Sequence, residues 1–254
     1  MKLILKNFIK IITYNMKIDY AIVSTDGNTL YDGFWDLIKP IWLKHIGIKP
    51  ILVKISNKDL ITDNGDYIIH EIKRINGIDT GFQSQISRMY VTKFYEEKIC
   101  LTSDIDMIPL SKNYFNEDID QYDQESLLIF TSNAYNGIDR YPICYNAGKG
   151  KLFSKILEIN DSFEDYCNKL LSFGWGWETD ELYFGLMVKK YLDQKNIIKL
   201  NRSWFNDSES TRIDRSNWSY NPEKVKSGEY IDSHSLRPYS QHKTEIDKLI
   251  KTII

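Results

Sequence analysis

The sequence has few cysteines, and the three that it has lie far apart. Cys100, Cys144 and Cys167 form no Cys-x-x-Cys pair in a chain of 254 residues. An odd number of widely spaced cysteines argues against a disulfide framework and against a structural zinc site. We therefore expect a reducing, cytoplasmic compartment.

Long apolar runs are lacking as well. No stretch approaches the roughly 20 consecutive apolar residues of a membrane span. Lys2, Lys6 and Lys10 interrupt the apolar first twelve residues, so they contain no signal-peptide core. On a helical wheel these lysines form one stripe beside an apolar face. Two interpretations stay open: a terminal segment packed on its own domain, or a basic amphipathic segment in peripheral contact with a membrane.

The charged residues show no basic excess. Lys and Arg number 33 against 35 Asp and Glu, which gives a net charge of -2. A protein that coats nucleic acid would need more positive charge, so we expect no nucleic-acid partner. Aromatic side chains are abundant, with 17 Tyr, 11 Phe and 6 Trp. They suit a flat or polyhydroxylated ligand, although core packing explains most aromatics in any domain.

The hydrophobic pattern predicts strands that alternate with helices. Strands are expected at 20–24, 51–55, 67–72, 99–102, 127–131, 142–145 and 197–200. Helices are expected at 31–46, where Pro40 kinks or splits the segment, and at 80–98, 151–159, 162–172 and 180–193. A loop-rich, polar segment then runs to residue 230. This order predicts an α/β fold with a mainly parallel mixed sheet, helices on both faces and ligands at the carboxyl ends of the strands.

Two Asp-x-Asp triplets occur, and their surroundings differ. Asp118 and Asp120 lie in an acidic, Gln- and Tyr-rich stretch that is typical of a solvated loop. Asp104 and Asp106 instead end an apolar run, where carboxylates are costly unless a cation meets them. Oxygen ligands at a strand end suit Mg²⁺ or Mn²⁺ carrying a diphosphate. The alternative is a buried aspartate that caps a turn.

The segment L-T-S-D-I-D-M-I-P-L, residues 101–110, resembles the Asp-x-Asp segment of GT-A-fold glycosyltransferases. The resemblance implies one GT-A-like domain over residues 1–254. In it, residues 20–110 would form the nucleotide-binding half, 111–240 the acceptor half and 241–254 a C-terminal helix. It also implies that Asp104 and Asp106 hold Mn²⁺ or Mg²⁺, with Ser103 and Asp104 against the nucleotide-sugar diphosphate.

Further positions are similar to the same family in the expected order. Thr25 and Asp26 match the end of the first strand, which receives the base and ribose of the donor. Arg88 matches the basic donor-site residue, with a solvent-facing helical arginine as the alternative. Asn146 and Gly148 belong to a Y-N-A-G segment like the one that lines the family's sugar pocket, and a plain turn is the alternative.

The segment F-G-W-G-W-E-T-D-E-L-Y-F-G, residues 173–185, resembles the Trp-Gly-x-Glu-Asp segment of β-1,4-galactosyltransferases. The resemblance implies sugar stacking by Trp175 and Trp177 and an acceptor base among neighbouring acids, which are Asp180, Glu178 and Glu181. Asp180 is the first choice, because Thr179 is expected to cap a helix that begins there. The segment departs from the family at Trp177, where a small residue is expected, and at Thr179, which separates the acids. Acids in a first helical turn also simply stabilise the helix, and inversion and retention both stay open.

A late histidine completes the pattern. His234, in a polar loop, resembles the C-terminal histidine of the family's metal shell, and His242 competes for that role. We therefore expect a metal-dependent glycosyltransferase that moves a sugar from a UDP- or GDP-sugar to a hydroxyl of a carbohydrate or glycoconjugate. Alternatives are an Asp-x-Asp phosphatase of haloacid-dehalogenase type and a non-catalytic carbohydrate-binding module. A nucleotidyltransferase would need a Gly-rich phosphate loop, which the N-terminal region lacks.

Overall fold

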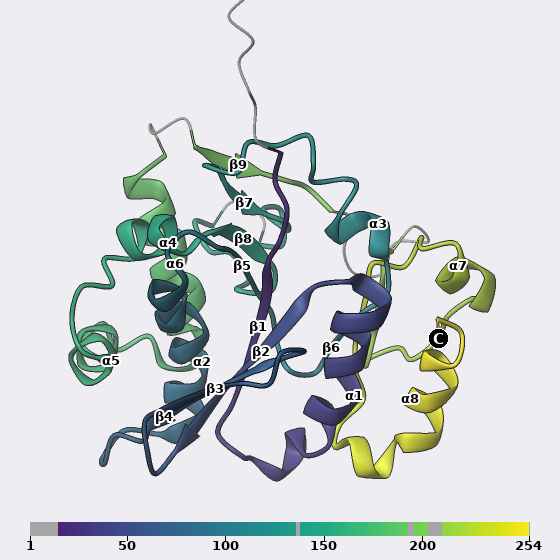
Figure 1. Cartoon of the computed structure of the whole chain (residues 1–254), viewed down its shortest axis with the longest axis horizontal. Helices are drawn as coiled ribbons and strands as arrows, with labels where there is room; N and C mark the ends of the chain where they lie inside the picture. Colours follow the sequence, from purple (N-terminus) through teal and green to yellow (C-terminus); the bar gives the residue numbers. More distant parts are fainter. Residues whose placement is uncertain (1–14, 136–137, 193–195, 203–209, 254) are drawn as a thin grey trace, which may run out of the picture.

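A computed structural model describes residues 15–135, 138–192, 196–202 and 210–253. Helices cover both faces of a central sheet (Figure 1). No helix in these ranges is long and apolar enough to cross a membrane. The basic amphipathic segment at 1–12, expected to pack on the domain or contact a membrane, lies outside the described residues.

The central sheet has eight strands in the order β3-β4-β2-β1-β5-β8-β7-β9. They are β1 (Tyr20–Thr25), β2 (Lys49–Ser56), β3 (Leu60–Asp63), β4 (Ile68–Lys73), β5 (Ile99–Thr102), β7 (Leu127–Ile129), β8 (Asn146–Lys149) and β9 (Ile197–Lys199). Four pairs of neighbours are parallel: β1 with β2, β1 with β5, β2 with β4, and β7 with β9. Antiparallel pairs join β3 to β4, and β8 to both β5 and β7. The prediction of a mainly parallel mixed sheet is confirmed.

Two hydrophobic cores lie on the two faces of this sheet. Along β1, Ala21 and Val23 face one core and Ile22 faces the other, because successive side chains of a strand point in opposite directions. The first core receives α1 (Phe34–Pro40), the π-helix η2 (Ile41–Ile46), α3 (Lys112–Phe115), α7 (Pro222–Lys226) and α8 (Lys243–Ile250). The second receives α2 (Thr80–Tyr90), α4 (Gly150–Ile156), α5 (Phe163–Leu171) and α6 (Thr179–Lys190). Helices therefore cover both faces, as the sequence predicts.

A second sheet has three short strands in the order β10-β11-β6. They are β6 (Met107–Pro109), β10 (Arg212–Asp214) and β11 (Asp232–His234). The middle strand, β11, runs antiparallel to β6 and parallel to β10. This small sheet joins the turn after β5 to a segment near the end of the chain.

A buried ionic cluster holds the small sheet together. The Asp232 side chain is 0% exposed and accepts hydrogen bonds from two arginines. Arg202 Nη1 and Nη2 donate to it at 2.7 and 2.9 Å, and Arg212 Nε and Nη2 donate at 2.8 and 3.0 Å. Burial opposes ionisation of Asp232, but the two guanidinium groups hold its pKa well below the ordinary value. The carboxylate of Asp232 in β11 thus links β10, through Arg212, to Arg202.

Most predicted elements form near their expected bounds, and the helical segment is split after Pro40 into α1 and the π-helix η2, as predicted. The strand expected at 142–145 is wrong, because the chain pairs as β8 at Asn146–Lys149 instead. The helix expected at 80–98 stays α-helical only to Tyr90 and continues as the 3-10 helix η3 (Val91–Tyr95). Elements without a predicted counterpart are β3, β6, β10, β11, α3, α7 and the 3-10 helices η1 (Thr29–Tyr31), η4 (Gly176–Glu178) and η5 (Tyr239–Gln241).

Candidate active site

A cavity of about 630 Å³ opens at the carboxyl ends of β1 and β5. Strands that run in parallel end at the same edge of a sheet, which is where α/β proteins bind ligands. Nine predicted site residues line it: Thr25, Asp26, Arg88, Asp104, Asp106, Trp177, Asp180, Glu181 and His234. The fold therefore brings together residues that are distant in the sequence.

The end of β1 forms a tight turn at the cavity. Asp26 Oδ1 accepts from the Asn28 backbone N–H at 3.0 Å, and Asp26 Oδ2 accepts from the Thr80 hydroxyl at 2.9 Å. Thr25 Oγ1 accepts from the Gly27 N–H at 3.1 Å, and φ of +81° at this glycine suits the turn. The turn links β1 to the start of α2 and fixes this wall of the cavity.

The acidic pair lies in the turn between β5 and β6. All four residues of β5 are buried, and so is Asp106, whereas Asp104 is partly exposed. Pairing of His234 with Met107 across β11 and β6 places the imidazole beside the preceding Asp106. His234 Nε2 lies 3.6 Å from Asp106 Oδ2, and His234 Nδ1 lies 3.1 Å from Asp214 Oδ2. The small sheet thus brings the predicted histidine to the second acid of the pair. His242, the competing candidate, forms the N-cap position of α8.

Two arginines also contact Asp106. Arg215 Nη1 donates to Asp106 Oδ2 at 2.8 Å, and Arg237 Nη1 lies 3.5 Å from the same oxygen. Burial opposes ionisation of Asp106, but His234 and these arginines hold its pKa below the ordinary value. Burial likewise opposes protonation of His234, yet Asp106 and Asp214 raise its pKa. The carboxylate of Asp106 therefore favours the protonated form of the His234 imidazole, and the imidazole favours the ionised form of Asp106.

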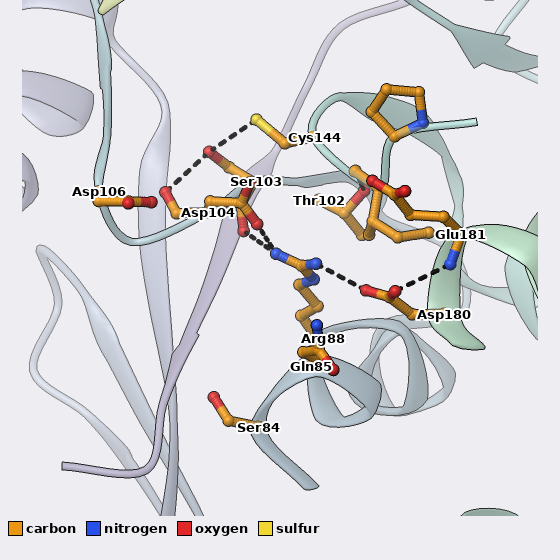
Figure 2. Close-up of polar contacts among 12 residues, drawn as sticks. Ser84, Gln85, Arg88, Thr102, Ser103, Asp104, Asp106, Cys144, Asp180 and Glu181 are labelled. Atoms are coloured by element: carbon orange, nitrogen blue, oxygen red, sulfur yellow. Dashed lines mark hydrogen bonds and ion pairs between the residues drawn. The ribbon is translucent and has the colours of Figure 1, made fainter. Parts of the chain in front are cut away.

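Arg88 connects the acidic pair to the predicted acceptor segment. It belongs to the last turn of α2, and its guanidinium lies between the carboxylates of Asp104 and Asp180 (Figure 2). Arg88 Nη2 donates to Asp180 Oδ2 at 2.9 Å, and Arg88 Nη1 forms an ion pair with Asp104 Oδ1. Only 2% of the Asp180 side chain is exposed. Arg88 is therefore a buried, ion-paired residue, and the solvent-facing alternative is wrong.

The other acids of the acceptor segment contact a residue that sequence analysis missed. Arg140 Nε donates to Glu181 Oε2 at 2.6 Å, and Arg140 Nη1 donates to Glu178 Oε1 at the same distance. The Tyr135 hydroxyl donates to both oxygens of Glu181, at 3.1 and 2.9 Å. Burial and the nearby Asp180 raise the pKa of Glu181, although Arg140 and Tyr135 oppose that shift. The net effect is a raised pKa, and so an increased basicity, of the Glu181 carboxylate.

The start of α6 differs from the prediction. Thr179 is expected to cap the helix, but it is the first helical residue, and the N-cap position belongs to Glu178, whose side chain makes no capping hydrogen bond. The Thr179 hydroxyl instead donates to the carbonyl of Gly176 at 2.7 Å. This bond closes the short 3-10 helix η4 (Gly176–Glu178), which runs directly into α6.

Four predicted ligand contacts lie away from the cavity lining. Ser103 and Asn146 are 0% exposed, and the Asn146 amide donates to the carbonyls of Pro142 and Ile143. Gly148 lies in β8, where an added Cβ would meet Leu127 and Ser126 at 3.2 and 3.3 Å. Trp175 stacks on Phe173 with ring centroids 4.4 Å apart. Asn146 and Gly148 pack inside the sheet, because β8 lies between β5 and β7, and Asn-Ala-Gly is a strand rather than the plain turn considered as an alternative.

The predicted metal ligands are only partly assembled. Among the described residues, no group of three or more His, Cys, Asp and Glu side chains is placed to hold a metal ion. Asp106 and His234 converge, but Asp104 faces Arg88. Carboxylate and imidazole are ligand types that suit Mn²⁺, but here Arg88 pairs with Asp104 and Arg215 with Asp106. The donor chemistry fits a divalent metal, and metal binding stays a prediction.

Several cavity residues have no counterpart in the sequence-based prediction. The tyrosines and arginines among them are Tyr31, Tyr135, Arg140, Arg215 and Arg237. Arg215 and Arg237 lie in the polar segment around His234, so the same resemblance that singled out the histidine could have drawn attention to them. Tyr135 and Arg140 occur in a loop without periodicity, and only the fold brings them to the acceptor segment.

Comparison with known proteins shows similarity of fold. No protein-family model matches the sequence, and no curated protein matches it. The galactosyltransferase LgtC, solved with donor and acceptor sugar analogs, is 9% identical with a TM-score of 0.50, and the match covers 92% of this chain and 95% of that one. The fold resembles that of LgtC. An active-site mutant of LgtC gives 10% identity, a TM-score of 0.51 and coverages of 92% and 94%.

A second glycosyltransferase is matched less completely. GlyE of Streptococcus pneumoniae TIGR4 is 14% identical with a TM-score of 0.42, over 72% of this chain and 45% of that one. The chain therefore spans less than half the length of GlyE. The match to LgtC confirms the expected GT-A-like α/β fold, and identities this low concern the fold alone.

Proposed function

We propose that the protein transfers a sugar from a nucleoside-diphosphate sugar to a hydroxyl acceptor with the help of a divalent metal ion. The observation that carries this proposal is the convergence of Asp106, His234 and two arginines at the carboxyl edge of the sheet. A site that combines carboxylate, imidazole and guanidinium groups suits a metal-bound diphosphate. The GT-A-like fold supports the same class of reaction by analogy.

On the donor side, Asp106, His234 and Asp104 would hold Mn²⁺ or Mg²⁺. When bound, the ion supplies positive charge that offsets the leaving diphosphate. Thr25 and Asp26 lie at the end of β1 in the same cavity, and they would contact the nucleoside. Arg88 is ion-paired with Asp104, so it would orient that carboxylate as well as face the donor sugar.

On the acceptor side, Asp180, Glu178 and Glu181 differ in their contacts, and these differences suggest a different role for each. The Asp180 carboxylate is occupied by Arg88 and 2% exposed, which argues against its role as the base and for a role in holding Arg88. Glu178 neutralises Arg140. Glu181 is ion-paired too, with Arg140, but its side chain is 19% exposed against 2% for Asp180, and burial and Asp180 raise its pKa, which suits a general base. We assign Glu181 this role, with Asp180 second.

The proposed reaction, if it inverts, needs only these groups. The acceptor hydroxyl oxygen forms a bond to the anomeric carbon as the bond from that carbon to the diphosphate oxygen breaks. The hydroxyl proton passes to Glu181, and the electron pair leaves with the nucleoside diphosphate. The Trp177 ring, whose residue is 67% exposed at the cavity, would offer an apolar face to the acceptor sugar.

Thermal unfolding of the full chain tests the donor assignment. UDP and GDP are added separately, each with Mn²⁺ or with a chelator. One of them at about 100 times its dissociation constant should stabilise the protein by about 2.7 kcal/mol, a shift of several degrees, only when Mn²⁺ is present. Equal shifts with chelator would remove the metal from the proposal, and no shift with either nucleotide would contradict the donor class.

A separate activity assay tests the phosphatase alternative. A haloacid-dehalogenase-type enzyme would use the first aspartate, Asp104, as nucleophile, but this carboxylate is ion-paired with Arg88. Hydrolysis of p-nitrophenyl phosphate that disappears in Asp104→Asn would favour the phosphatase. The carbohydrate-binding alternative predicts sugar binding that needs neither Mn²⁺ nor a nucleotide.

A further inference from the structure

Arg215 lies directly on the second acid of the Asp-x-Asp pair. It follows β10, and its side chain is 27% exposed at the cavity. Its Nη1 donates to Asp106 Oδ2 at 2.8 Å, a shorter distance than that from Arg237 or from His234 to the same oxygen. Neither arginine belongs to the predicted metal or donor residues. The positively charged guanidinium of Arg215 is therefore already paired with Asp106.

Three positively charged or protonatable groups share this one oxygen. Arg215, Arg237 and His234 all approach Asp106 Oδ2, within 2.8 to 3.6 Å. A divalent cation that bound Asp106 would meet at least two guanidinium charges at close range, and like charges repel strongly where burial limits screening. A cation and Arg215 therefore compete for Asp106.

The two arginines differ in how firmly they are held. Arg237 donates from Nη1 to the Tyr31 hydroxyl, and its guanidinium lies over the Tyr31 ring, 5.2 Å from the centroid. Among the described residues, Arg215 donates a side-chain hydrogen bond to Asp106 only. Arg215 is thus the arginine that can leave Asp106 without breaking a second contact of this kind.

A guanidinium displaced into this cavity meets the site proposed for the diphosphate. Arginine binds phosphate oxygens through two parallel N–H donors, and such charge-assisted bonds are among the strongest hydrogen bonds in proteins. We infer that Arg215 competes with the divalent cation for Asp106 and contacts the diphosphate once the cation is bound. This inference rests on the proposed function, and it makes Arg215 the residue through which metal and nucleotide affinities are coupled.

The test compares metal binding with nucleotide binding in one set of variants. Mn²⁺ affinity is measured from the spin-resonance signal of free Mn²⁺, and UDP and GDP affinity by calorimetry at saturating Mn²⁺. Arg215→Gln removes the charge and Arg215→Lys keeps it. Lys151→Gln is the matched control, because it removes one positive charge from α4, where Lys151 pairs with the exposed Glu97. Melting temperature is checked for each variant.

The expected results have opposite signs. Without nucleotide, Arg215→Gln should bind Mn²⁺ about tenfold more tightly than wild type, because a competing charge is gone. With Mn²⁺ bound, the same variant should bind the nucleoside diphosphate at least about tenfold more weakly, because phosphate contacts are lost. Arg215→Lys should lie between, and Lys151→Gln should match wild type in both measurements.

The outcomes separate this inference from the proposed function. Unchanged or weaker Mn²⁺ binding in Arg215→Gln overturns the competition, even if wild type binds UDP or GDP with Mn²⁺. Tighter Mn²⁺ binding with unchanged nucleotide affinity overturns the contact with the diphosphate. If wild type binds neither nucleotide, the proposed donor fails, whereas tighter Mn²⁺ binding in Arg215→Gln still supports the competition at Asp106.

Discussion

Replacing Asp232 with asparagine should destabilise the protein strongly. The Asp232 side chain is 0% exposed, and its partners Arg202 and Arg212 are 1% and 8% exposed, so the variant leaves two buried positive charges without their carboxylate. Breaking a buried ion pair by removing one partner costs about 3–5 kcal/mol. For a chain of this size that corresponds to a fall in melting temperature of about 6–20 °C.

Circular dichroism melting of Asp232→Asn measures this loss. Asp118→Asn is the matched control, because it makes the same chemical change at an exposed residue and should alter the melting temperature by less than about 2 °C. A comparable melting temperature for Asp232→Asn and wild type would refute the reasoning, since it would mean that the buried arginines do not need this charge.

The stabilisation that Asp232 provides should also depend on pH, in a direction that its pKa fixes. The two arginines hold the folded-state pKa of Asp232 below its value in the unfolded chain. The charge therefore stabilises the fold fully above the unfolded-state pKa of about 4, and this contribution is lost as pH falls toward the folded-state pKa. Asp232→Asn lacks the contribution, so the difference in melting temperature between wild type and variant should shrink below about pH 4. A difference that stays constant or grows on acidification would contradict the assignment.

Three further predictions concern the site. Asp106→Asn should lower sugar transfer by about 10²-fold or more, because it removes a charged metal ligand. Asp118→Asn should leave the transfer rate unchanged, and equal damage at both positions would mean that the wrong acidic pair was chosen. Glu181→Gln should lower transfer by about 10²–10⁴-fold with nucleoside diphosphate affinity near normal, whereas Asp180→Asn should weaken that affinity by releasing Arg88. The reverse ranking, seen in parallel transfer and binding assays, would make Asp180 the base. Trp177→Ala should raise the acceptor KM without changing the melting temperature, since the residue is exposed, and an unchanged KM would exclude stacking.

Sequence analysis predicted the part of the fold that local pattern determines. β1 and β5 are apolar runs that end in polar residues, so both the strands and the acids after them are visible in a short window. The same holds for α2, where Asp79 caps the helix by accepting from the Phe82 N–H at 2.8 Å. Periodicity within these windows placed Arg88 one helix before the acidic pair.

The remaining structure depends on pairing between distant segments. β6, β10 and β11 have three residues each, and R-I-D and D-S-H show no apolar pattern, so only their mutual pairing makes them strands. β8 was misplaced for a related reason: N-A-G-K looks like a turn, but the narrow space beside Leu127 selects small residues there. The positions of Arg140 and Arg215 also depend on contacts between distant segments. A single sequence does not reveal which distant segments pair.

The pairing of β6 with β11 has a consequence for the order in which the chain acquires its site. The central sheet is made by residues 20–199, whereas the small sheet needs residues 212–234 to return to residues 107–109. Closing so long a loop is entropically slow compared with forming local elements. During synthesis, the large sheet can assemble while Asp106 still lacks His234 and Arg215, which come from the last part of the chain. A ribosome-bound fragment that ends before residue 212 would therefore possess the scaffold and the acidic pair but none of the groups that neutralise Asp106.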